Sequence, residues 1–484
     1  MIIPLINLPS PFLTDEKTLM PLGLLYLGAS AEYHGRRACV VDLAGCPDYV
    51  ERAVRELSLL RPEPTAVGIS ITASQAKLAR ELASAIRDHF PGVRLVAGGA
   101  HVTHSIKASA RQPERTRGLV SDLHRNYDVL VMGDGELALQ AAFAADAPRI
   151  IDATLPSSEY YVGSRWLDRL PYPARHLIGA SGYRYNLGHV CINESNAVNI
   201  ISQRGCPFAC RFCAGRMDAS ARLMRRPSAA HVLGEIKQLY DTYGYTDFTF
   251  YDDELNADRG LGPLLAGLID LQARLEHQMR FRCFLRADLA THTQIRALAK
   301  AGFVVIAIGA ESGSERMLTN MGKRVTKDQN TRVIEWARSA GIYTKAIISI
   351  GHPGESPETL AETERWLDAV QLEDVNFTIV SALPSSCYYD GAVRRGGVWV
   401  YTCPENGDRL YDFGVNWAET VHFINGAPSA DYNPSIYTDS LSPSDLASWH
   451  RYFEAKYKAH HDAEPAAEPG TGATKPFCAV HAIH

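Results

Sequence analysis

The stretch "SQRGCPFACRFCAGR" (residues 202–216) decides how the rest of the chain is interpreted. Its cysteines, Cys206, Cys210 and Cys213, are spaced C-x3-C-x2-C. Three thiolates at this spacing can bind three irons of a [4Fe-4S] cluster and leave the fourth iron open, whereas clusters that only carry electrons are held by four cysteines. The apolar run "AVNII" precedes the stretch, so we expect the cysteines on a loop that leaves a strand.

The three cysteines have two alternative uses, a zinc site and a buried core. Structural zinc sites are usually built from paired C-x2-C units with a fourth Cys or His, which this stretch lacks. Three buried thiols in a core strand are the other alternative, but Pro207, Arg211 and Arg216 suit such a strand poorly. We therefore favour the cluster.

The cysteine spacing, with the aromatic Phe212 just before the third cysteine, resembles the radical S-adenosylmethionine (SAM) superfamily. The resemblance implies that SAM binds the open iron and is cleaved reductively. It also implies a partial barrel of six βα units, with the cluster loop after the first strand.

The composition excludes several classes of protein. The 484 residues are 46% hydrophobic and carry a net charge of −5, without a basic block for nucleic acid. No apolar stretch is long enough for a membrane span, and the N-terminus lacks the features of a signal peptide. Ten cysteines in so long a chain do not suggest a disulfide framework, so we expect the reducing cytoplasm.

Residues 1–147 alternate short apolar strands with helical patterns, which predicts a doubly wound parallel sheet, an α/β fold. The strands are expected at 2–8, 38–43, 66–71, 94–97 and 129–132. Small polar loops follow three of them: "SITAS" (70–74), "GGAHVTHS" (98–105) and "GDGE" (133–136). Ligands of such sheets bind at the carboxyl ends of the strands.

The segments "PLGLLYLGA", "VGIS", "VAGGAHVT" and "VMGDGE" resemble, in this order, the cobalamin-binding domain found ahead of radical SAM domains. The resemblance implies that the cobalamin tail threads among the loops. The residues implied in cobalamin binding are Ser70, Thr72, Gly98, Gly99, His101, Val102, Thr103, Gly133, Gly135 and Glu136.

The first loop departs from the D-x-H-x-x-G motif of many cobalamin-binding domains. It reads "NLPSPFLTDEKTL" (7–19) and contains no histidine to bind cobalt. We therefore expect base-off cobalamin without a histidine ligand, with His101 and His104 as tail contacts or polar packing.

The rest of the chain divides into four expected segments: a linker (148–195), the barrel (196–399), a small helical cap (400–461), and a linker and tail (462–484). Barrel strands are expected at 198–201, 247–251, 280–285, 304–308, 345–350 and 376–380. In the tail, Cys478, His481 and His484 have metal-like spacing, but a hydrophobic or mobile tail is the interpretation that we favour.

Residues at successive barrel strand ends match motifs of the superfamily: "FYDDELN", "FLRADL", "AIGAESGSE" and "IISIGHPGES". The residues implied in SAM binding are Phe212, Asp252, Asp253, Arg286, Glu311, Ser312 and Gly351. A solvated acidic turn at 252–254 and an internal pair of Arg286 with Asp288 are the alternatives. The substrate contacts that we suggest, on weaker grounds, are His352, Ser385 and Tyr388.

The resemblances imply a cobalamin-dependent radical SAM methyltransferase that acts on an unactivated carbon of a small biosynthetic intermediate. An external donor of flavodoxin or ferredoxin type is implied, because no second cluster motif is present. The alternatives are radical ring contraction, cyclisation or oxidation with the same cofactors, and a non-catalytic cobalamin sensor, which would not need the three cysteines.

Overall fold

The computed structural model describes residues 2–10, 13, 16–179, 197–218, 220–257, 259–415 and 434–458. The chain divides into two compact units. Of the described residues, unit 1 contains those up to 179 together with 214–227 and Val415, and unit 2 contains 197–213, 228–414 and 434–458.

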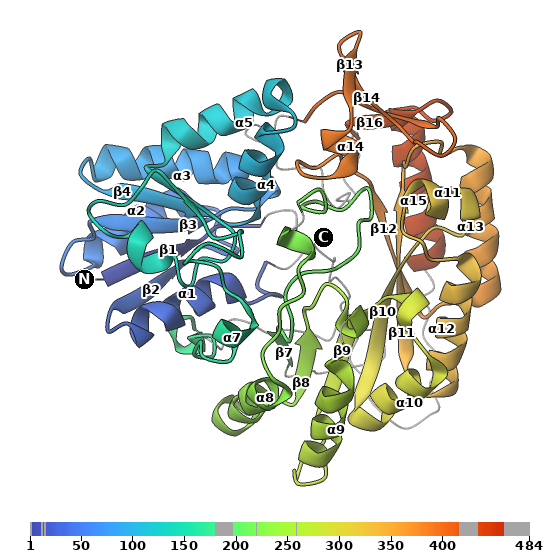
Figure 1. Cartoon of the computed structure of the whole chain (residues 1–484), viewed down its shortest axis with the longest axis horizontal. Helices are drawn as coiled ribbons and strands as arrows, with labels where there is room; N and C mark the ends of the chain where they lie inside the picture. Colours follow the sequence, from blue (N-terminus) through green and yellow to red (C-terminus); the bar gives the residue numbers. More distant parts are fainter. Residues whose placement is uncertain are drawn as a thin grey trace. The chain divides into compact units, whose positions relative to one another are not determined.

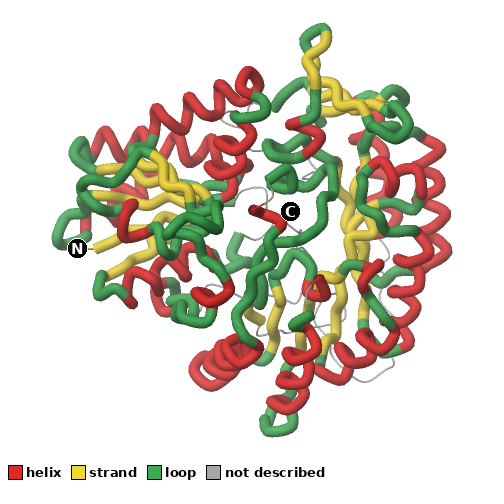
Figure 2. Tube along the Cα trace, in the orientation of Figure 1, coloured by secondary structure: helices red, strands yellow, loops and turns green. Residues whose placement is uncertain are grey.

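Unit 1 contains a six-stranded parallel sheet in the order β2-β1-β3-β4-β5-β6 (Figures 1 and 2). Because the order reverses between β1 and β3, the carboxyl ends of these two strands form the expected binding edge. The strands are β1 (Ile2–Asn7), β2 (Arg37–Asp42), β3 (Ala66–Ser70), β4 (Arg94–Gly98), β5 (Val129–Met132) and β6 (Ile150–Asp152).

Helices cover both faces of this sheet, and each face has its own apolar core. One core takes residues from α2, α3, α4 and α5, and the other takes residues from α1 and α6. The helices are α1 (Leu22–Tyr33), α2 (Tyr49–Leu59), α3 (Ala76–His89), α4 (Ala100–Ser109), α5 (Pro113–Asn126), α6 (Leu139–Ala142) and α7 (Ser164–Leu167). The doubly wound fold expected from the sequence is confirmed, with β6 as an added strand in the segment that was expected to be a linker.

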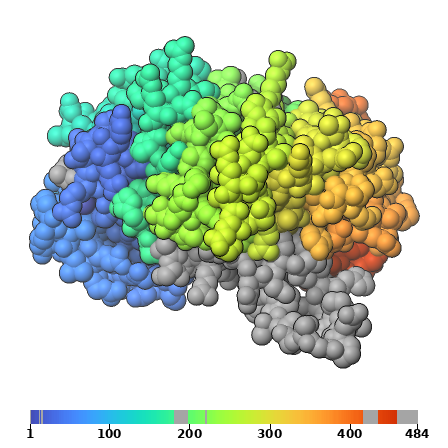
Figure 3. All heavy atoms as spheres, turned by 90° about the horizontal axis from the view of Figure 1, so that it is seen from below, coloured from blue at the N-terminus to red at the C-terminus, as the bar shows by residue number. Residues whose placement is uncertain are grey.

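Unit 2 is built on six parallel strands in sequential order, from β7 to β12. They are β7 (Ala197–Ile200), β8 (Asp247–Phe250), β9 (Arg280–Leu285), β10 (Phe303–Glu311), β11 (Tyr343–Ile350) and β12 (Asp374–Ile379). The helices between them are α8 (Ala229–Tyr243), α9 (Leu261–Gln272), α10 (His292–Ala301), α11 (Glu315–Asn320), α12 (Lys327–Ser339) and α13 (Pro357–Val370). Figure 3 shows one face of the molecular surface, on which the colours of this unit run in sequence order from green through yellow to orange.

The βα units follow from local sequence signals. Thr326 caps α12 in a capping box with Gln329, and Ser356 caps α13, whose first turn contains Pro357. The phenylalanines of β8, β9 and β10 pack on one another, with Phe250 and Phe303 stacked at 5.5 Å between ring centroids. The partial barrel of six units is confirmed.

The segment after the barrel differs from the expected helical cap. Its described residues form a four-stranded antiparallel sheet and two helices: α14 (Cys387–Asp390), β13 (Val393–Arg395), β14 (Val398–Thr402), β15 (Arg409–Asp412), β16 (Ile436–Thr438) and α15 (Pro443–Lys458). The expectation of a purely helical cap is wrong, because β-branched and aromatic residues such as those of "VWVYT" pair as strands across a turn. The tail cysteine and histidines lie outside the described residues.

None of the described helices combines the length and the apolar character that crossing a bilayer requires.

Candidate cofactor sites

The three predicted cluster ligands lie on one loop after β7. Gly205 has a φ of 88°, a conformation that favours glycine and turns the chain just before Cys206. Cys206 is buried, and Cys210 and Cys213 are partly buried. The amide of Cys213 donates to the carbonyl of Cys210 at 3.2 Å, so these two share a turn. Three thiols on one short loop fit a cluster with three protein ligands.

The zinc alternative gains no support from this loop. Within the described ranges, no three His, Cys, Asp or Glu side chains are gathered as ligands of a single metal ion. The cysteines of a [4Fe-4S] cluster each bind a different iron, so they need not converge on one point.

Asp252, at the end of β8, holds the start of the cluster loop. Its Oδ1 accepts from the amides of Ser202 at 2.7 Å and Gln203 at 2.9 Å, and its Oδ2 accepts from the Ser202 hydroxyl. Burial raises the pKa of Asp252 to about 7, against the lowering effect of these hydrogen bonds. Both oxygens are therefore engaged within the protein, which favours a positioning role over direct SAM contact. Asp253, beside it, is only partly buried.

Arg286, after β9, lies against the cluster loop. Its Nη1 is 3.6 Å from Cys210 Sγ, and its guanidinium carbon is 3.7 Å from the ring centre of Phe208. Its Nε is 2.7 Å from Asp288 Oδ1, so the internal pair considered from the sequence is present. Arg286 therefore places a positive charge next to one of the three predicted cluster ligands.

A buried ion pair joins Glu311, at the end of β10, to Lys323, with 2.7 Å between Oε1 and Nζ. Glu311 has a φ of 62°, and a register irregularity at this point sets its side chain off the regular strand. Lys323 was not singled out from the sequence, because it follows α11 and matches no motif considered. Its ammonium is brought to the site only by the fold.

Glu254 has an acceptor oxygen without a protein partner. Its Oε2 is buried and makes no hydrogen bond. Burial raises the pKa of Glu254 to about 7, while Lys323 and Arg286 oppose this shift. An unpartnered buried carboxylate oxygen between cations fits a ligand with a donor group, such as the ammonium of an amino acid moiety.

Two other predicted SAM contacts are engaged within unit 2. The Ser312 hydroxyl is 2.9 Å from that of Thr363 on α13. Gly351 has a φ of 87°, and its amide donates to Glu355 Oε2 at 3.2 Å. Gly351 therefore belongs to a tight turn, as the motif implied, while the Ser312 side chain faces the helix.

The suggested substrate contacts form a buried cluster beside Phe212. His352 Nδ1 is 3.0 Å from the Tyr388 hydroxyl, and the rings of His352 and Phe212 meet edge to face at 5.4 Å. The side chains of His352, Tyr388 and Ser385 are almost fully buried. The Ser385 amide donates to Asp390. His352 and Tyr388 thus pack against the cluster loop, at Phe212 and Arg211.

In unit 1, the loops at the carboxyl edge of the sheet are bonded to one another. Gln75 Nε2 donates to Leu8 O and Pro9 O, both at 3.2 Å, joining the loops after β1 and β3. Thr103 Oγ1 donates to Gly99 O and accepts from the Gly133 amide, each at 3.0 Å, joining the loops after β4 and β5. The edge is therefore preorganised.

The remaining predicted cobalamin contacts differ in how far the protein itself already engages them. Thr72 caps a short 3-10 helix with Gln75. Ser70 and Gly135 are partly buried, while Glu136 is buried and its carbonyl accepts from Ser30. Val102 belongs to an apolar core.

His101 and His104 lie on α4 and are shielded from water. Burial, helped by the nearby His104, lowers the pKa of His101 to about 4. Burial, helped by Arg216, likewise lowers the pKa of His104 to about 4. Both imidazoles are therefore neutral at pH 7.

Residues 214–227, just after the third cysteine, pack within unit 1. A Cβ on Gly215 would lie 2.6 Å from the His104 ring, and Arg225 pairs with Asp134 of the "GDGE" loop. Lys107 of α4 lies 3.5 Å from Asp218. The sequence did not single out this segment as part of the first unit.

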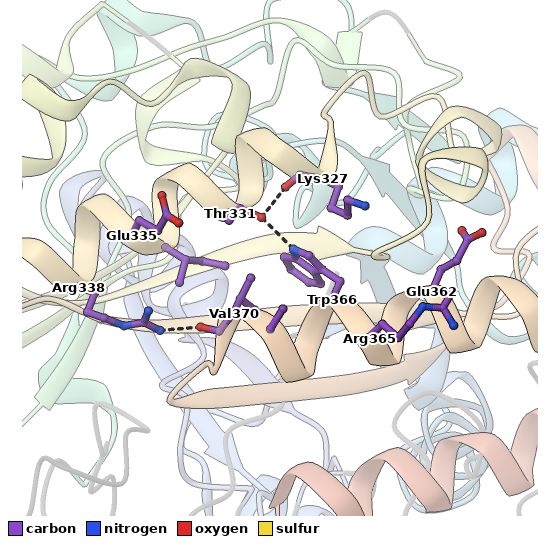
Figure 4. Close-up of a pocket in the computed structure, with 10 residues that line it drawn as sticks. Lys327, Thr331, Glu335, Arg338, Glu362, Arg365, Trp366 and Val370 are labelled. Carbon is purple, nitrogen blue, oxygen red and sulfur yellow. Dashed lines mark hydrogen bonds between the residues drawn. The ribbon is translucent and has the colours of Figure 1, made fainter.

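An open groove lies between α12 and α13, with a volume of about 520 Å³ (Figure 4). Arg338, Arg365 and Trp366 line it together with Glu335 and Glu362. None of the predicted site residues lines this groove, so it is separate from the cluster loop.

Sequence comparison identifies part of unit 2. Residues 200–367 match the Radical SAM superfamily. An uncharacterized methyltransferase of Pyrococcus horikoshii is 23% identical, over 78% of this chain and 79% of its own. Cytidylyl-2-hydroxyethylphosphonate methyltransferase of Streptomyces wedmorensis is 24% identical, over 78% of each chain. Anaerobic magnesium-protoporphyrin IX monomethyl ester cyclase of Cereibacter sphaeroides is 24% identical, over 70% of this chain and 54% of its own.

Structural comparison extends the likeness to both units. The radical SAM methyltransferase TsrM of Kitasatospora setae, solved with cobalamin and a [4Fe-4S] cluster, gives a TM-score of 0.61 at 18% identity, over 82% of this chain and 77% of its own. The cobalamin-dependent SAM radical enzyme OxsB gives a TM-score of 0.59 at 19% identity, over 76% of this chain and 52% of its own. At such identities the likeness is one of fold. Residues 200–367 thus match the Radical SAM superfamily, and the fold of the chain is like that of TsrM and OxsB.

Proposed function

We propose that this enzyme is a cobalamin-dependent methyltransferase that methylates an unactivated carbon of a small biosynthetic intermediate. The observation that carries the proposal is the convergence on the cluster loop of residues from successive strand ends. Asp252 after β8 bonds the start of the loop, and Arg286 after β9 lies 3.6 Å from Cys210 Sγ. Both are placed to serve a cofactor held by the three cysteines.

The roles of the chain's own residues follow from their contacts. Cys206, Cys210 and Cys213 would hold the cluster. Glu254 would accept a hydrogen bond from the SAM ammonium with its unpartnered oxygen, alongside Asp253. Glu311, from β10, would accept hydrogen bonds from the ribose with the oxygen that does not bind Lys323.

Unit 1 would hold cobalamin at the edge formed by the loops after β1, β3, β4 and β5. In the residues as printed, the loop after β1 contains no histidine, so the cobalamin would be base-off without a histidine ligand. When bound, the cluster supplies the electron that cleaves SAM, and cobalamin carries the methyl group. A reducing compartment such as the cytoplasm and an external donor of flavodoxin or ferredoxin type follow from this chemistry.

The test measures methyl transfer to the cofactor, which requires no substrate. The purified, anaerobically reconstituted chain is incubated with reductant, cobalamin and SAM labelled in its methyl group. We expect labelled methylcobalamin together with S-adenosylhomocysteine, and neither product when cobalamin is omitted. SAM cleavage to 5′-deoxyadenosine, without label on cobalamin, would count against methyl transfer.

The second candidate is a radical cyclisation or another rearrangement with the same cofactors. It is favoured by the likeness to the ester cyclase, although this chain spans only 54% of that protein. It predicts the second of the two outcomes above, 5′-deoxyadenosine alone.

A further inference from the structure

A turn outside the barrel reaches the cluster loop. Residues 403–408 connect β14 and β15, and Glu405 in this turn binds both terminal nitrogens of Arg211. The distance from Nη1 to Oε2 is 2.6 Å. The hydrogen bond from Arg211 lowers the pKa of Glu405 to about 2, so the carboxylate is ionised at neutral pH. Arg211 itself lies between Cys210 and Cys213.

The backbone of Arg211 is held as well. Its amide donates to the carbonyl of Met321 at 2.9 Å, and its carbonyl accepts from the Tyr388 amide at 3.3 Å. Gly322 has a φ of 63°, and a Cβ there would lie 3.2 Å from Arg211 Cγ. Only a residue without a side chain leaves this space free.

The turn is fastened to α11 and the residues after it, independently of Arg211. Asp408 pairs with Arg316 at 2.6 Å and accepts from Asn320 Nδ2 at 2.8 Å. Asn406 Nδ2 donates to Asn320 Oδ1 at 2.8 Å. The turn is thus a fixed support, from which Glu405 extends to the cluster loop.

We propose that the 403–408 turn is a clamp in which Glu405, through Arg211, fixes the relative positions of Cys210 and Cys213. Only two residues separate these cysteines, so a rotation at Arg211 would change the spacing of the two thiolates. Glu405 and Arg211 are positioning residues. This inference rests on the proposed cluster. Its consequence is that iron leaves the cluster more slowly when the clamp is intact than when it is broken.

The test compares E405Q with D439N in the full-length, reconstituted chain. Asp439 pairs with Arg409 at 2.7 Å, an exposed ion pair of the same kind at the same antiparallel sheet, but without contact to Arg211. Iron and sulfide per chain, and the rate at which a chelator removes iron, are measured beside the thermal unfolding midpoint. We expect E405Q to lose iron about ten- to hundredfold faster than wild type, the range typical of outer-shell partners of metal ligands. R211K should lose iron faster as well, because lysine cannot bind a carboxylate with two parallel hydrogen bonds.

The possible results separate the hypotheses. Iron loss from E405Q at the wild-type rate would overturn the clamp while leaving the cluster intact. A lowered unfolding midpoint that accounts for the faster loss, with D439N equally affected, would assign Glu405 to general stability and overturn the clamp as well. A wild-type chain that takes up no iron would overturn the cluster and the clamp together.

Discussion

Asp252 shows how one buried carboxylate can organise a cofactor loop. It joins the end of β8 to the amides of Ser202 and Gln203, which begin the cluster loop. The carboxylate form of Asp252, which prevails above its raised pKa of about 7, accepts stronger hydrogen bonds than a neutral group does. Its side chain therefore supports the cysteines indirectly.

This role predicts that D252N lowers stability and iron content together. The amide keeps one acceptor oxygen but presents an NH2 group where the second acceptor was, so we expect a loss of about 1.5–3 kcal/mol in the free energy of unfolding. Urea unfolding and iron analysis check it. D253N is the matched control, for which we expect weaker SAM binding at normal iron content. If D252N and D253N lowered the free energy of unfolding equally, the assignment of Asp252 to the support of the cluster loop and of Asp253 to SAM binding would be wrong.

His101 gives unit 1 a predictable response to acid. Its pKa is about 4 in the fold, against 6.5 for an ordinary histidine, because it is buried and close to His104. Between these two values the unfolded chain binds more protons than the folded one, so stability falls as the pH drops from 6.5 to 4.

We therefore expect H101N to remove part of this acid sensitivity. The stability of wild type relative to H101N should fall by roughly 1–3 kcal/mol between pH 6.5 and pH 4. Urea unfolding of both proteins at several pH values measures the difference. If the difference in the free energy of unfolding between wild type and H101N stays constant from pH 6.5 to pH 4, the pKa of His101 is the same in the folded and the unfolded chain. That outcome would contradict the prediction.

At the scale of elements, the turn between β4 and α4 contains two glycines with unequal demands. A Cβ on Gly99 would lie 2.7 Å from the Ile71 carbonyl oxygen, and its φ is 96°. A Cβ on Gly98 would meet nothing closer than 3.6 Å. The fold itself therefore requires glycine at position 99. At position 98 there is room for a side chain, so glycine there leaves space at the edge of the sheet.

We expect G99A to destabilise unit 1 by at least about 1 kcal/mol, and G98A to fold like wild type. Thermal unfolding measures the first effect, and cobalamin titration of G98A shows whether a ligand approaches its backbone. If G99A and G98A had similar unfolding midpoints, the conclusion that the fold needs glycine at position 99 but not at position 98 would be wrong.

Elements with strong local signals could be predicted from the sequence. The barrel strands and the capping boxes of α12 and α13 needed only apolar runs and cap residues a few positions apart. By contrast, β6 is three residues long, and the β14–β15 connection (403–408) is longer than two residues, so its Asn406-Gly407 pair does not form the two-residue turn that announces a hairpin. Contacts across large separations, such as Arg211 with Glu405, 194 positions away, depend on the whole fold and leave no local pattern.

At the scale of the whole molecule, each unit has a sheet and core of its own. We therefore expect the triple variant C206A/C210A/C213A to lose iron and still bind cobalamin with an affinity within about threefold of wild type, since none of these cysteines supports the core of unit 1. Metal analysis and absorbance titration check both statements. A joint loss of iron and cobalamin binding would show that the two sites are coupled.

The membership of residues 214–227 in unit 1 has a consequence for protein engineering. An exchange of cobalamin domains between relatives, with a single junction before the barrel, would replace Asp134 and His104, the partners of Arg225 and Gly215 in this segment, with foreign residues. A working hybrid needs further junctions on either side of residues 214–227, so that the segment after the third cysteine is inherited with the first domain. Recombination at a single point should therefore yield few active hybrids in this enzyme.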